Sequence, residues 1–397
     1  MTRDALSVTL GIGGAPYQKT LAAALLKAGM LRRALNMGPL LNIQDPGPDG
    51  SLEVIKQFPI HKLVRRLMWG IWRRLPEKVR PGYPSMIEAR FADELWSRWI
   101  PPCDVFHGWT GFSLACLRSA KRVGARTMLE NPGSHPRRWH ASGIEECGLF
   151  GINPKDRFVA MTARNADRIE EEFGLCDRIL VPSQYSFESF AERGLADKVQ
   201  VVATGVDTQF FSPPPSMLER SVFRVCFVGR VELAKGIGYL LQAWKRLALA
   251  NAELVLVGGV KREMYPVLLR YADSSVRTTG IVSAEAVAQC YRESDLFAIA
   301  SVNEGLAQVL LEAMASGLPV AASDHSGAND IITDGKEGFI LPVRDVDRLA
   351  EAILWGYQHR DELRAMGRAA RERIESNFTL EHYNQRMIAV YRAVAAT

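Results

Sequence analysis

Short apolar runs alternate with helical patterns along the first half of the chain. An Ala- and Leu-rich helical pattern spans Tyr17–Lys27, a turn cluster covers Asp45–Gly50, and a further helix is expected to end near Gly124. Strands of a parallel sheet are buried on both faces, so they are continuous apolar runs with little alternation. The runs that we interpret as strands are LSVTLGIG, SLEVIKQFP, CDVFHGW, ARTMLE and RILVPS.

The same alternation restarts after a break at three prolines, Pro213–Pro215, with one helix expected from about Gly238 to Leu249. Strands alternating with helices predict an α/β protein with two doubly wound parallel sheets. Ligands of such folds bind beyond the carboxyl ends of the strands, so two facing sheets predict an interdomain cleft. The strands expected in the second half are FRVCFVGR, AELVLVGG, SVRTTG, DLFAIA, LPVAAS and GFILPV.

The composition and the cysteines indicate in which cellular compartment the protein is expected. A hydrophobic content of 47% and a charged content of 23% are ordinary for a globular chain of 397 residues. The six cysteines form no CxxC pair and have no histidine at zinc-ligand spacing, so we expect reduced thiols. The start of the chain, MTRDALSV, lacks the apolar run of a signal peptide, and no stretch reaches the roughly 18 apolar residues that span a bilayer. We therefore expect a cytoplasmic protein.

Positive charge is concentrated in one segment, residues 62–80. It carries seven cations against Glu77, whereas the whole chain has a formal net charge of +5. Apolar side chains recur at helical spacing from Val64 to Leu75, beside Trp69, with cations on the opposite face. A basic amphipathic helix of this kind predicts contact with an anionic membrane surface, and the alternative is an ordinary core-packed helix. Basic residues are not spread over a domain face, so no nucleic-acid partner is expected.

The segment Ser301–Gly317 carries the most specific chemical pattern. Glu304 follows the strand DLFAIA, and Glu312 lies eight residues later, in a helix that we expect to open at Gly305. At about 100° per residue, eight residues place the two side chains ~80° apart around the helix axis, so they would lie on roughly the same face. The start of a helix suits an anion, and carboxylates accept hydrogen bonds from paired hydroxyls. Phosphate together with sugar hydroxyls describes a nucleotide-sugar.

Two cations follow the first strand of the second half. In FVGRVELAKG, Arg230 comes directly after the strand and Lys235 lies in the next loop, with glycines on either side. Arginine is a forked donor for phosphate oxygens and lysine a mobile point charge, so the pair could neutralise a diphosphate. The alternative is a solvated loop with two surface cations.

Gly13 and Gly14 form a tight loop between the first strand and the first helix. In GIGGAP the third glycine of a dinucleotide fingerprint is replaced by Pro16. In GGAPYQKT, Gln18 replaces the glycine that a P-loop requires before its lysine. Neither motif is complete. The Gly13–Gly14 loop is therefore either a loop that leaves space for a ligand or a plain turn.

Asp345-Val346-Asp347 has the spacing of a metal-binding DxD motif. It stands between GFILPV and a helical run, where aspartate commonly caps a helix. We interpret Asp345 as a cap and expect neither a metal nor another cofactor.

Five ordered segments together resemble the retaining GT-B glycosyltransferases of family 4, the glycosyl transferases group 1. The match covers about residues 180 to 345 and is weaker at the amino terminus. The segments are VPSQYSFESF, ATGVDTQFFSP, FVGRVELAKGIGYLLQAW, SVNEGLAQVLLEAMASGLPVAAS and GFILPV.

The resemblance implies a GT-B fold of two Rossmann-like domains that face a cleft. We place the acceptor-binding domain at residues 1–208 and the nucleotide-sugar-binding domain at 209–378. A last helix, about 379–397, is expected to pack back on the first domain.

The resemblance also implies roles for residues of the second domain. Arg230 and Lys235 match the pair that binds the donor diphosphate, Glu304 the acid on the transferred sugar, and Glu312 the acid on the ribose. Backbone N–H groups of Gly305, Leu306 and Ala307 would contact the sugar and the phosphate. The family often has an aromatic residue at the position of Leu306 and a glycine at the position of Ala307.

In the first domain, the resemblance gives the Gly13–Gly14 loop a role in admitting the diphosphate and the acceptor, with Gly14 as a donor-binding residue. It implies an active-site histidine after the strand ARTMLE. We assign it to His135, with Glu130 at the strand end as the fallback catalytic residue; His107 and His140 are weaker candidates.

The expected activity is transfer of a hexose, with retention, from a nucleoside-diphosphate sugar to a hydroxyl of a glycan or lipid-linked acceptor. UDP is favoured over GDP, and the basic segment would hold the enzyme on the inner face of the cell membrane. The alternatives are a sugar-nucleotide epimerase or phosphorylase on the same fold, or an inactive nucleotide-sugar-binding protein.

Overall fold

The structure is a computed structural model, and it describes residues 6–12, 16–36, 84–153, 159–215 and 221–397, together with Gly70 and Arg74. Four features expected from the sequence lie outside these ranges. They are the Gly13–Gly14 loop, the turn cluster Asp45–Gly50, the strand expected at SLEVIKQFP and, apart from Gly70 and Arg74, the basic segment 62–80.

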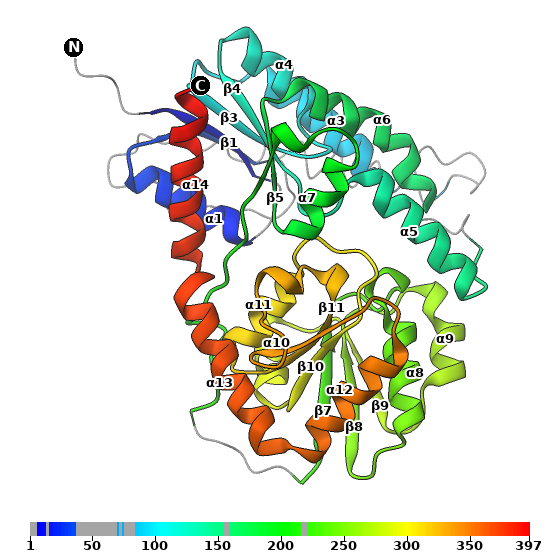
Figure 1. Ribbon diagram of the computed structural model, residues 1–397. Helices are drawn as coiled ribbons and strands as arrows, with labels where there is room; N and C mark the ends of the chain where they lie inside the picture. The colour runs from blue at the N-terminus through cyan, green and yellow to red at the C-terminus, as the bar shows by residue number, and fades with distance from the viewer. Residues whose placement is uncertain are drawn as a thin grey trace.

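The first half of the chain forms a six-stranded parallel sheet in the order β2-β1-β3-β4-β5-β6 (Figure 1). Its strands are β1 (Val8–Ile12), β2 (Leu31–Asn36), β3 (Val105–Trp109), β4 (Arg126–Glu130), β5 (Arg178–Val181) and β6 (Val199–Val201). Its helices are α1 (Pro16–Lys27), α3 (Pro84–Ser97), α4 (Leu114–Arg122), α5 (Pro136–Leu149), α6 (Val159–Leu175) and α7 (Gln184–Ala191).

The second half forms another six-stranded parallel sheet, in the order β12-β11-β10-β7-β8-β9. Its strands are β7 (Phe223–Val228), β8 (Ala252–Val257), β9 (Val276–Gly280), β10 (Leu296–Ile299), β11 (Val320–Ser323) and β12 (Gly338–Leu341). Its helices are α8 (Ile237–Leu247), α9 (Tyr265–Tyr271), α10 (Ala284–Arg292), α11 (Gln308–Ala315), α12 (Val346–Gln358) and α13 (Arg360–Asn377). Two doubly wound α/β sheets were predicted, and that prediction is confirmed.

Both faces of the first sheet are buried, which explains the continuous apolar runs of its strands. Val105 on β3 and Met128 on β4 belong to a core on one face, while their neighbours Phe106 and Leu129 belong to a core on the other. Successive side chains of a strand point to opposite faces, so most residues of a central strand are apolar when helices cover both sides.

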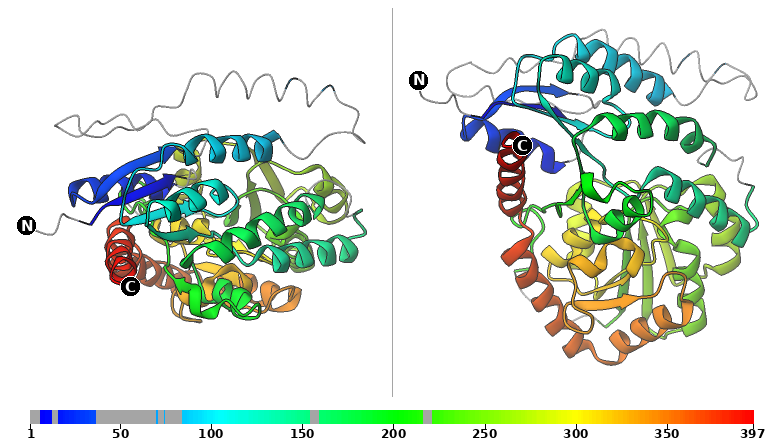
Figure 2. Two further views of the ribbon diagram at one scale, coloured as in Figure 1. Left: turned by 90° about the horizontal axis from the view of Figure 1, so that it is seen from above. Right: turned by 45° about the horizontal axis from the view of Figure 1, so that its top comes forward.

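The last helix, α14 (Leu380–Ala395), lies on the first domain beside α1 (Figures 1 and 2). Tyr383 packs edge-on against Tyr17 at 5.0 Å between ring centroids, and Met387 and Tyr391 join the same core as Leu10 of β1. A segment from the end of the chain thus supplies part of the core under the first sheet.

Two strands and one helix start differ from the sequence expectations. The edge strands β2, with its two arginines, and β6, with three residues, were not predicted, because neither forms a continuous apolar run. Helix α11 begins at Gln308 and not at Gly305. Glu304 therefore lies in the loop before the helix, and the helical angle between Glu304 and Glu312 does not apply.

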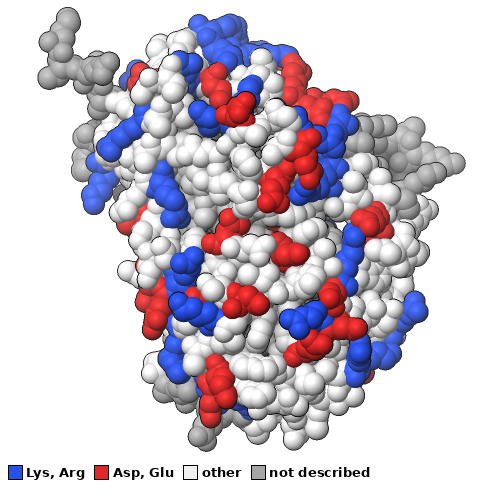
Figure 3. All heavy atoms as spheres, viewed as in Figure 1, with Lys and Arg blue, Asp and Glu red and all other residues white. Residues whose placement is uncertain are grey.

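None of the helices in the described residues is both long and apolar enough to cross a bilayer. On the face in Figure 3, basic and acidic side chains are intermixed over both domains. This pattern differs from the continuous basic face that nucleic-acid-binding domains present.

Candidate active site

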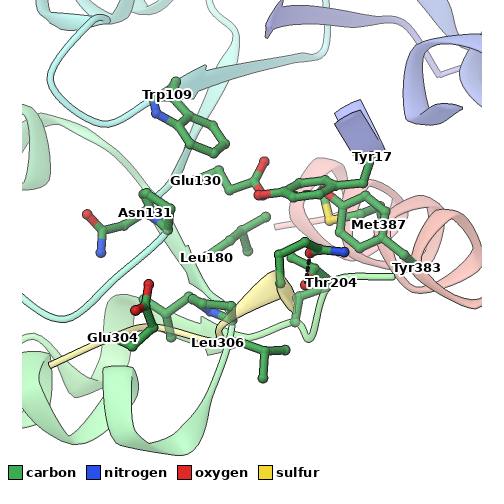
Figure 4. Close-up of a pocket in the computed structure, with 15 residues that line it drawn as sticks. Tyr17, Trp109, Glu130, Asn131, Leu180, Thr204, Glu304, Leu306, Tyr383 and Met387 are labelled. Carbon is green, nitrogen blue, oxygen red and sulfur yellow. Dashed lines mark hydrogen bonds between the residues drawn. The ribbon is translucent and has the colours of Figure 1, made fainter. Parts of the chain in front are cut away.

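A cavity of about 210 Å³ lies between the two domains, at the carboxyl ends of their strands (Figure 4). Loops that follow parallel strands meet at this edge of each sheet, which is where ligands of doubly wound folds bind. One wall comes from the first domain and α14, and includes Tyr17, Trp109, Glu130, Asn131, Tyr383 and Met387. The facing wall comes from the second domain and includes Glu304, Leu306 and Gln308.

Glu304 on this wall forms an ion pair with Lys235, and Ser301 Oγ donates to the same carboxylate at 3.3 Å. Lys235 ends a short 3₁₀ turn that is packed against the end of β10. Gly236 has a positive φ of 66°, and a Cβ there would lie closer than 3.0 Å to the carbonyl oxygen of Ala300. Only glycine allows the backbone at residue 236 to pack this closely against Ala300, and this packing places Lys235 next to Glu304.

Arg230 stands at the same edge of the second sheet, directly after β7 and Gly229. Its guanidinium is 57% exposed and pairs with the buried Glu232 at 2.9 Å. The neighbouring Gly258, after β8, lies so close to the backbone of Gly229 that a side chain would not fit there. Arg230 thus lies half-exposed at a tightly packed pair of strand ends, on the sheet edge from which the loop with Lys235 also starts.

Glu312 lies on α11 and accepts a hydrogen bond from the Tyr291 hydroxyl at 3.1 Å. Burial raises the pKa of its carboxyl to about 7, although the Tyr291 hydrogen bond acts in the opposite direction. The side chain does not line the described cavity, whereas Glu304 does.

Of the three residues expected to offer a backbone N–H to the ligand, Ala307 already donates its N–H within the protein. Its N–H donates to the carbonyl of Ser326 at 3.1 Å, so it is not available to a ligand in this structure. Leu306 lines the cavity, and the Gly305 carbonyl accepts from Ser183 Oγ at 2.7 Å. The expectation that all three residues offer free N–H groups is therefore wrong for Ala307.

The loop after β4 fits against the loop after β10, and so joins the domains. Ser134 Oγ donates to Asn303 Oδ1 at 2.6 Å, and Asn303 Nδ2 donates to Ser142 Oγ at 3.2 Å. A Cβ on Gly305 would lie closer than 3.0 Å to the carbonyl oxygen of Pro132. The two domains are therefore in close contact around the cavity. This contact requires glycine at position 305, because any side chain there would overlap the backbone of Pro132.

Glu130 ends β4 and reaches the cavity from a buried polar cluster. Its carboxylate accepts from Gln18 Nε2 at 3.2 Å and from the Tyr383 hydroxyl at 3.5 Å, and His107 Nε2 lies 3.7 Å away. Burial raises the pKa of Glu130 to about 7, while burial lowers that of His107 to about 3. His107 is thus a neutral neighbour, held by the Tyr391 hydroxyl at 2.7 Å from Nδ1.

His135 lies behind the cavity wall. It caps α5, its N–H donates to Ser189 Oγ at 2.8 Å, and the residue is 1% exposed. The imidazole packs against Phe173 and Phe190, at 5.7 and 5.0 Å between ring centroids, and burial lowers its pKa to about 4. It is not part of the cavity lining, in contrast to Glu130. His140 lies farther along α5 and is half-buried.

The Asp345–Asp347 motif is accounted for by helix structure. Asp345 caps α12 by accepting from the Arg348 N–H at 2.9 Å, as predicted, and Asp347 pairs with Arg246. Within the described ranges, no group of three or more His, Cys, Asp or Glu side chains is arranged to hold a metal ion. All six cysteines are free thiols.

Comparison with known proteins agrees with this arrangement. Residues 222–359 match the family model described as Glycosyl transferases group 1. The GDP-mannose-dependent alpha-mannosyltransferase of Mycobacterium tuberculosis is 35% identical over 209 residues, covering 49% of this chain and 52% of that protein. The chain spans about half the length of the curated relatives it matches.

Solved structures extend the likeness to both domains. Sucrose-phosphate synthase from Thermosynechococcus elongatus has a TM-score of 0.70 at 18% identity and covers 99% of this chain and 100% of its own. HepE from Anabaena, solved with UDP-glucose, has a TM-score of 0.64 at 15% identity and covers 98% and 100%. These structures share the two-domain GT-B fold of this chain, and the residues that match the family model lie in its second domain.

Sequence reasoning missed most of the first-domain wall of the cavity. Tyr17, Trp109, Tyr383 and Met387 come from α1, the end of β3 and α14. Trp109 follows CDVFHG at a strand end, a position that could have marked it. The residues on α1 and α14 follow ordinary helical apolar patterns, which give no sign that they also face a cavity.

Proposed function

We propose that this chain is a retaining glycosyltransferase that transfers a hexose from a nucleoside-diphosphate sugar to a hydroxyl acceptor. The observation that carries the proposal is the Lys235–Glu304 ion pair, whose glutamate lines the interdomain cavity, with Arg230 at the same sheet edge. Two cations beside one carboxylate suit a donor that has a diphosphate at one end of its reacting bond and a polyhydroxylated ring at the other.

Each residue has a distinct part in this proposal. Arg230 and Lys235 neutralise the charge that develops on the departing diphosphate, while Glu304 accepts hydrogen bonds from hydroxyls of the transferred sugar. Glu312 holds the ribose of the donor. The acceptor hydroxyl attacks from the face that the diphosphate leaves, and a phosphate oxygen takes the acceptor proton. Positioning and charge stabilisation then supply the catalysis, with neither a metal nor a covalent intermediate.

UDP is the favoured nucleotide and GDP the second. Support for UDP comes from the HepE structures, which hold UDP and UDP-glucose. Support for GDP comes from the mannosyltransferase of Mycobacterium tuberculosis, whose name specifies a GDP-mannose donor.

Thermal unfolding with a panel of nucleotides and nucleotide-sugars tests the donor directly. A nucleoside-diphosphate sugar should raise the melting temperature, and incubation with an acceptor should release the nucleoside diphosphate. EDTA should leave the rate unchanged, and the product should keep the anomeric configuration of the donor. Interconversion of the donor sugar without transfer would instead indicate an epimerase, and binding without any turnover would indicate an inactive binding protein.

The geometry favours Glu130 over His135 as the active-site residue of the first domain. We predict that Glu130→Gln lowers kcat/KM for the acceptor about ten- to a hundredfold, because a hydrogen bond to a charged group contributes about 1.5–3 kcal/mol. His135→Ala should change it less, since the imidazole packs into the core behind the wall. Steady-state kinetics with thermal unfolding of each variant make the comparison. A larger loss of turnover in His135→Ala at unchanged stability would return the role to His135.

The basic segment 62–80 supports a further proposal, that the enzyme works at a membrane surface. Near an anionic surface each cation contributes up to about 1 kcal/mol, so co-sedimentation with vesicles containing anionic lipid should exceed that with neutral ones and weaken with salt. Replacing Arg65, Arg66, Arg73 and Arg74 together by Glu should abolish the difference. Equal binding of the unaltered protein to both kinds of vesicle would contradict the proposal.

A further inference from the structure

Helix α5 follows β4 of the first domain, but its far end lies on the second domain (Figure 1). Cys147 is buried in the core of the second domain, and Phe150 and Ile152, just after the helix, pack against the same core. The ring centroid of Phe150 lies 5.3 Å from that of Tyr239, in the first turn of α8. The contact between the domains therefore extends beyond the interdomain cavity.

A buried carboxylate joins α5 to two segments of the second domain. Glu146 is fully buried, and its two oxygens accept from the Tyr239 hydroxyl at 2.9 Å and from Arg344 Nε at 2.7 Å. The same guanidinium donates twice to Glu145, at 2.8 and 2.6 Å. Paired hydrogen bonds between a guanidinium and a carboxylate fix the orientation of both groups. We refer to Glu145, Glu146, Tyr239 and Arg344 as the α5 cluster.

The backbone at Arg344 is in the left-handed region, with a φ of 67°. Residues other than glycine rarely adopt this conformation, and it persists where surrounding contacts hold it. The hydrogen bonds to Glu145 and Glu146 are such contacts. Glycine adopts the same conformation without strain, so Arg344→Gly removes the guanidinium and still allows the loop its shape.

The α5 cluster lies next to the turn that carries Lys235. This turn, Leu233–Lys235, packs against α5, and Tyr239 follows it within the first turn of α8. The turn also contacts the loop after β10, where the Val302 N–H donates to the carbonyl of Ala234 at 3.0 Å. A helix from one domain and a loop of the other therefore hold the lysine between them.

Helix α5 also contacts the loop that carries Glu304, the partner of Lys235. Ser142 on α5 accepts a hydrogen bond from Asn303 Nδ2 at 3.2 Å, and Asn303 directly precedes Glu304. The helix is thus bonded beside each member of the Lys235–Glu304 ion pair, through Asn303 on one side and Tyr239 on the other. A shift of α5 would reach both members of the pair.

We propose that Glu146 and Arg344 are positioning residues for Lys235. Through Tyr239 and the packing of α5 on the turn, they hold the lysine where the transfer reaction needs its charge. This inference rests on the proposed function and adds a contribution of the first domain to the donor site. Among the described residues that line the interdomain cavity, Glu146 and Arg344 do not occur, so they act through the lysine.

Hydrogen exchange followed by mass spectrometry tests the positioning without any measurement of activity. In Arg344→Gly and in Tyr239→Phe, the amides of residues 233–240 should exchange at least about threefold faster, whereas those of β8 should not change. Burial raises the pKa of Glu146, although its bonds to Arg344 and Tyr239 act in the opposite direction. Without Arg344 the carboxyl can therefore take up a proton, and the variant should fold. Unchanged exchange in a folded variant overturns the inference.

A double-mutant cycle with Lys235→Ala shows whether the α5 cluster acts through the lysine. Arg344→Gly alone should lower kcat roughly tenfold or more, with a smaller change in the dissociation constant of the nucleoside diphosphate. In the Lys235→Ala protein the same substitution should lower kcat less than about twofold, because no lysine is left to position. Equal losses in both backgrounds overturn the inference, since a general structural defect acts in both. Tyr239→Phe gives a second cycle if Arg344→Gly fails to fold.

Each variant has a matched control on the same domain. Arg348→Ala removes an arginine four residues from Arg344, which pairs on the surface with Glu351 at 2.6 Å. Tyr357→Phe removes a hydroxyl that donates to the carbonyl of Ala250 at 3.0 Å. Both controls should keep the kcat and the hydrogen exchange of the unaltered protein.

The cycle also separates this inference from the proposed function. If Lys235→Ala itself keeps normal turnover, the diphosphate role in the proposed function fails and the inference fails with it. If Lys235→Ala is slow while folded Arg344→Gly and Tyr239→Phe keep normal turnover, the inference alone fails.

Discussion

Arg230→Ala and Lys235→Ala should each lower turnover by roughly 10²–10³, equivalent to about 3–4 kcal/mol of transition-state stabilisation. The two cations lie at one sheet edge, and Lys235 is held against Glu304 by the tight turn at Gly236. In the proposed mechanism, their interaction with the diphosphate would strengthen as negative charge develops on the leaving group. Losing either cation should therefore lower kcat more than donor affinity. Steady-state kinetics and calorimetric titration with the nucleoside diphosphate measure the two quantities.

Two substitutions on the same domain serve as controls for this experiment. Arg368→Ala on α13 and Lys336→Ala before β12 each remove an exposed cation far along the chain from the two strand ends. Both controls should retain normal turnover. Near-normal turnover of Arg230→Ala and Lys235→Ala at saturating donor and acceptor would contradict the diphosphate role.

Gly305→Ala should reduce kcat/KM by at least about a hundredfold while each domain remains folded. A Cβ at this position would overlap the carbonyl oxygen of Pro132, which is backbone and cannot rotate away. The loop after β10 would have to move away from the loop after β4, and the Ser134–Asn303 hydrogen bond of 2.6 Å would be lost with it. Displacements of about 1 Å at a reacting centre cost on the order of a hundredfold in rate.

Gly174→Ala is the matched control for Gly305→Ala. Gly174 lies in α6, and a Cβ there would meet nothing within 4 Å. Alanine is also the better helix former, so this variant should be neutral or slightly more stable. If Gly305→Ala keeps normal kinetics, close contact between these two loops is not needed for activity.

The placement of the candidate residues of the second domain could be predicted from the sequence because the elements that hold them are local. Arg230 and Lys235 lie within seven residues of the end of β7, and Glu304 lies within five residues of the end of β10. An apolar run marks each strand, and the edge rule for parallel sheets then places the residues that follow. The two sheets could be predicted because strands covered on both faces are mostly apolar along their length.

Only the tertiary structure decided which residues of the first domain face the cavity. His135 and Glu130 are both near the end of β4, and the sequence favoured the histidine. Packing of the imidazole between Phe173 and Phe190 turns it away, whereas Glu130, at the last position of the strand, reaches the cavity. The choice depends on how α5, α6 and α7 pack against one another, which no local pattern encodes.

Which residues form the first-domain wall of the cavity was likewise decided by the tertiary structure. Tyr383 and Met387 are more than 250 residues from Glu130 along the chain, and they reach it because α14 returns to the first domain. Their helical spacing determined that they would be buried. What they would be buried against depended on the path of the chain between the domains, because hydrophobic burial is non-directional and does not select a partner. The sequence by itself thus determined the two sheets and the placement of Arg230, Lys235 and Glu304 after strands of the second one, and the packing of α14, α5, α6 and α7 determined the first-domain wall of the cavity.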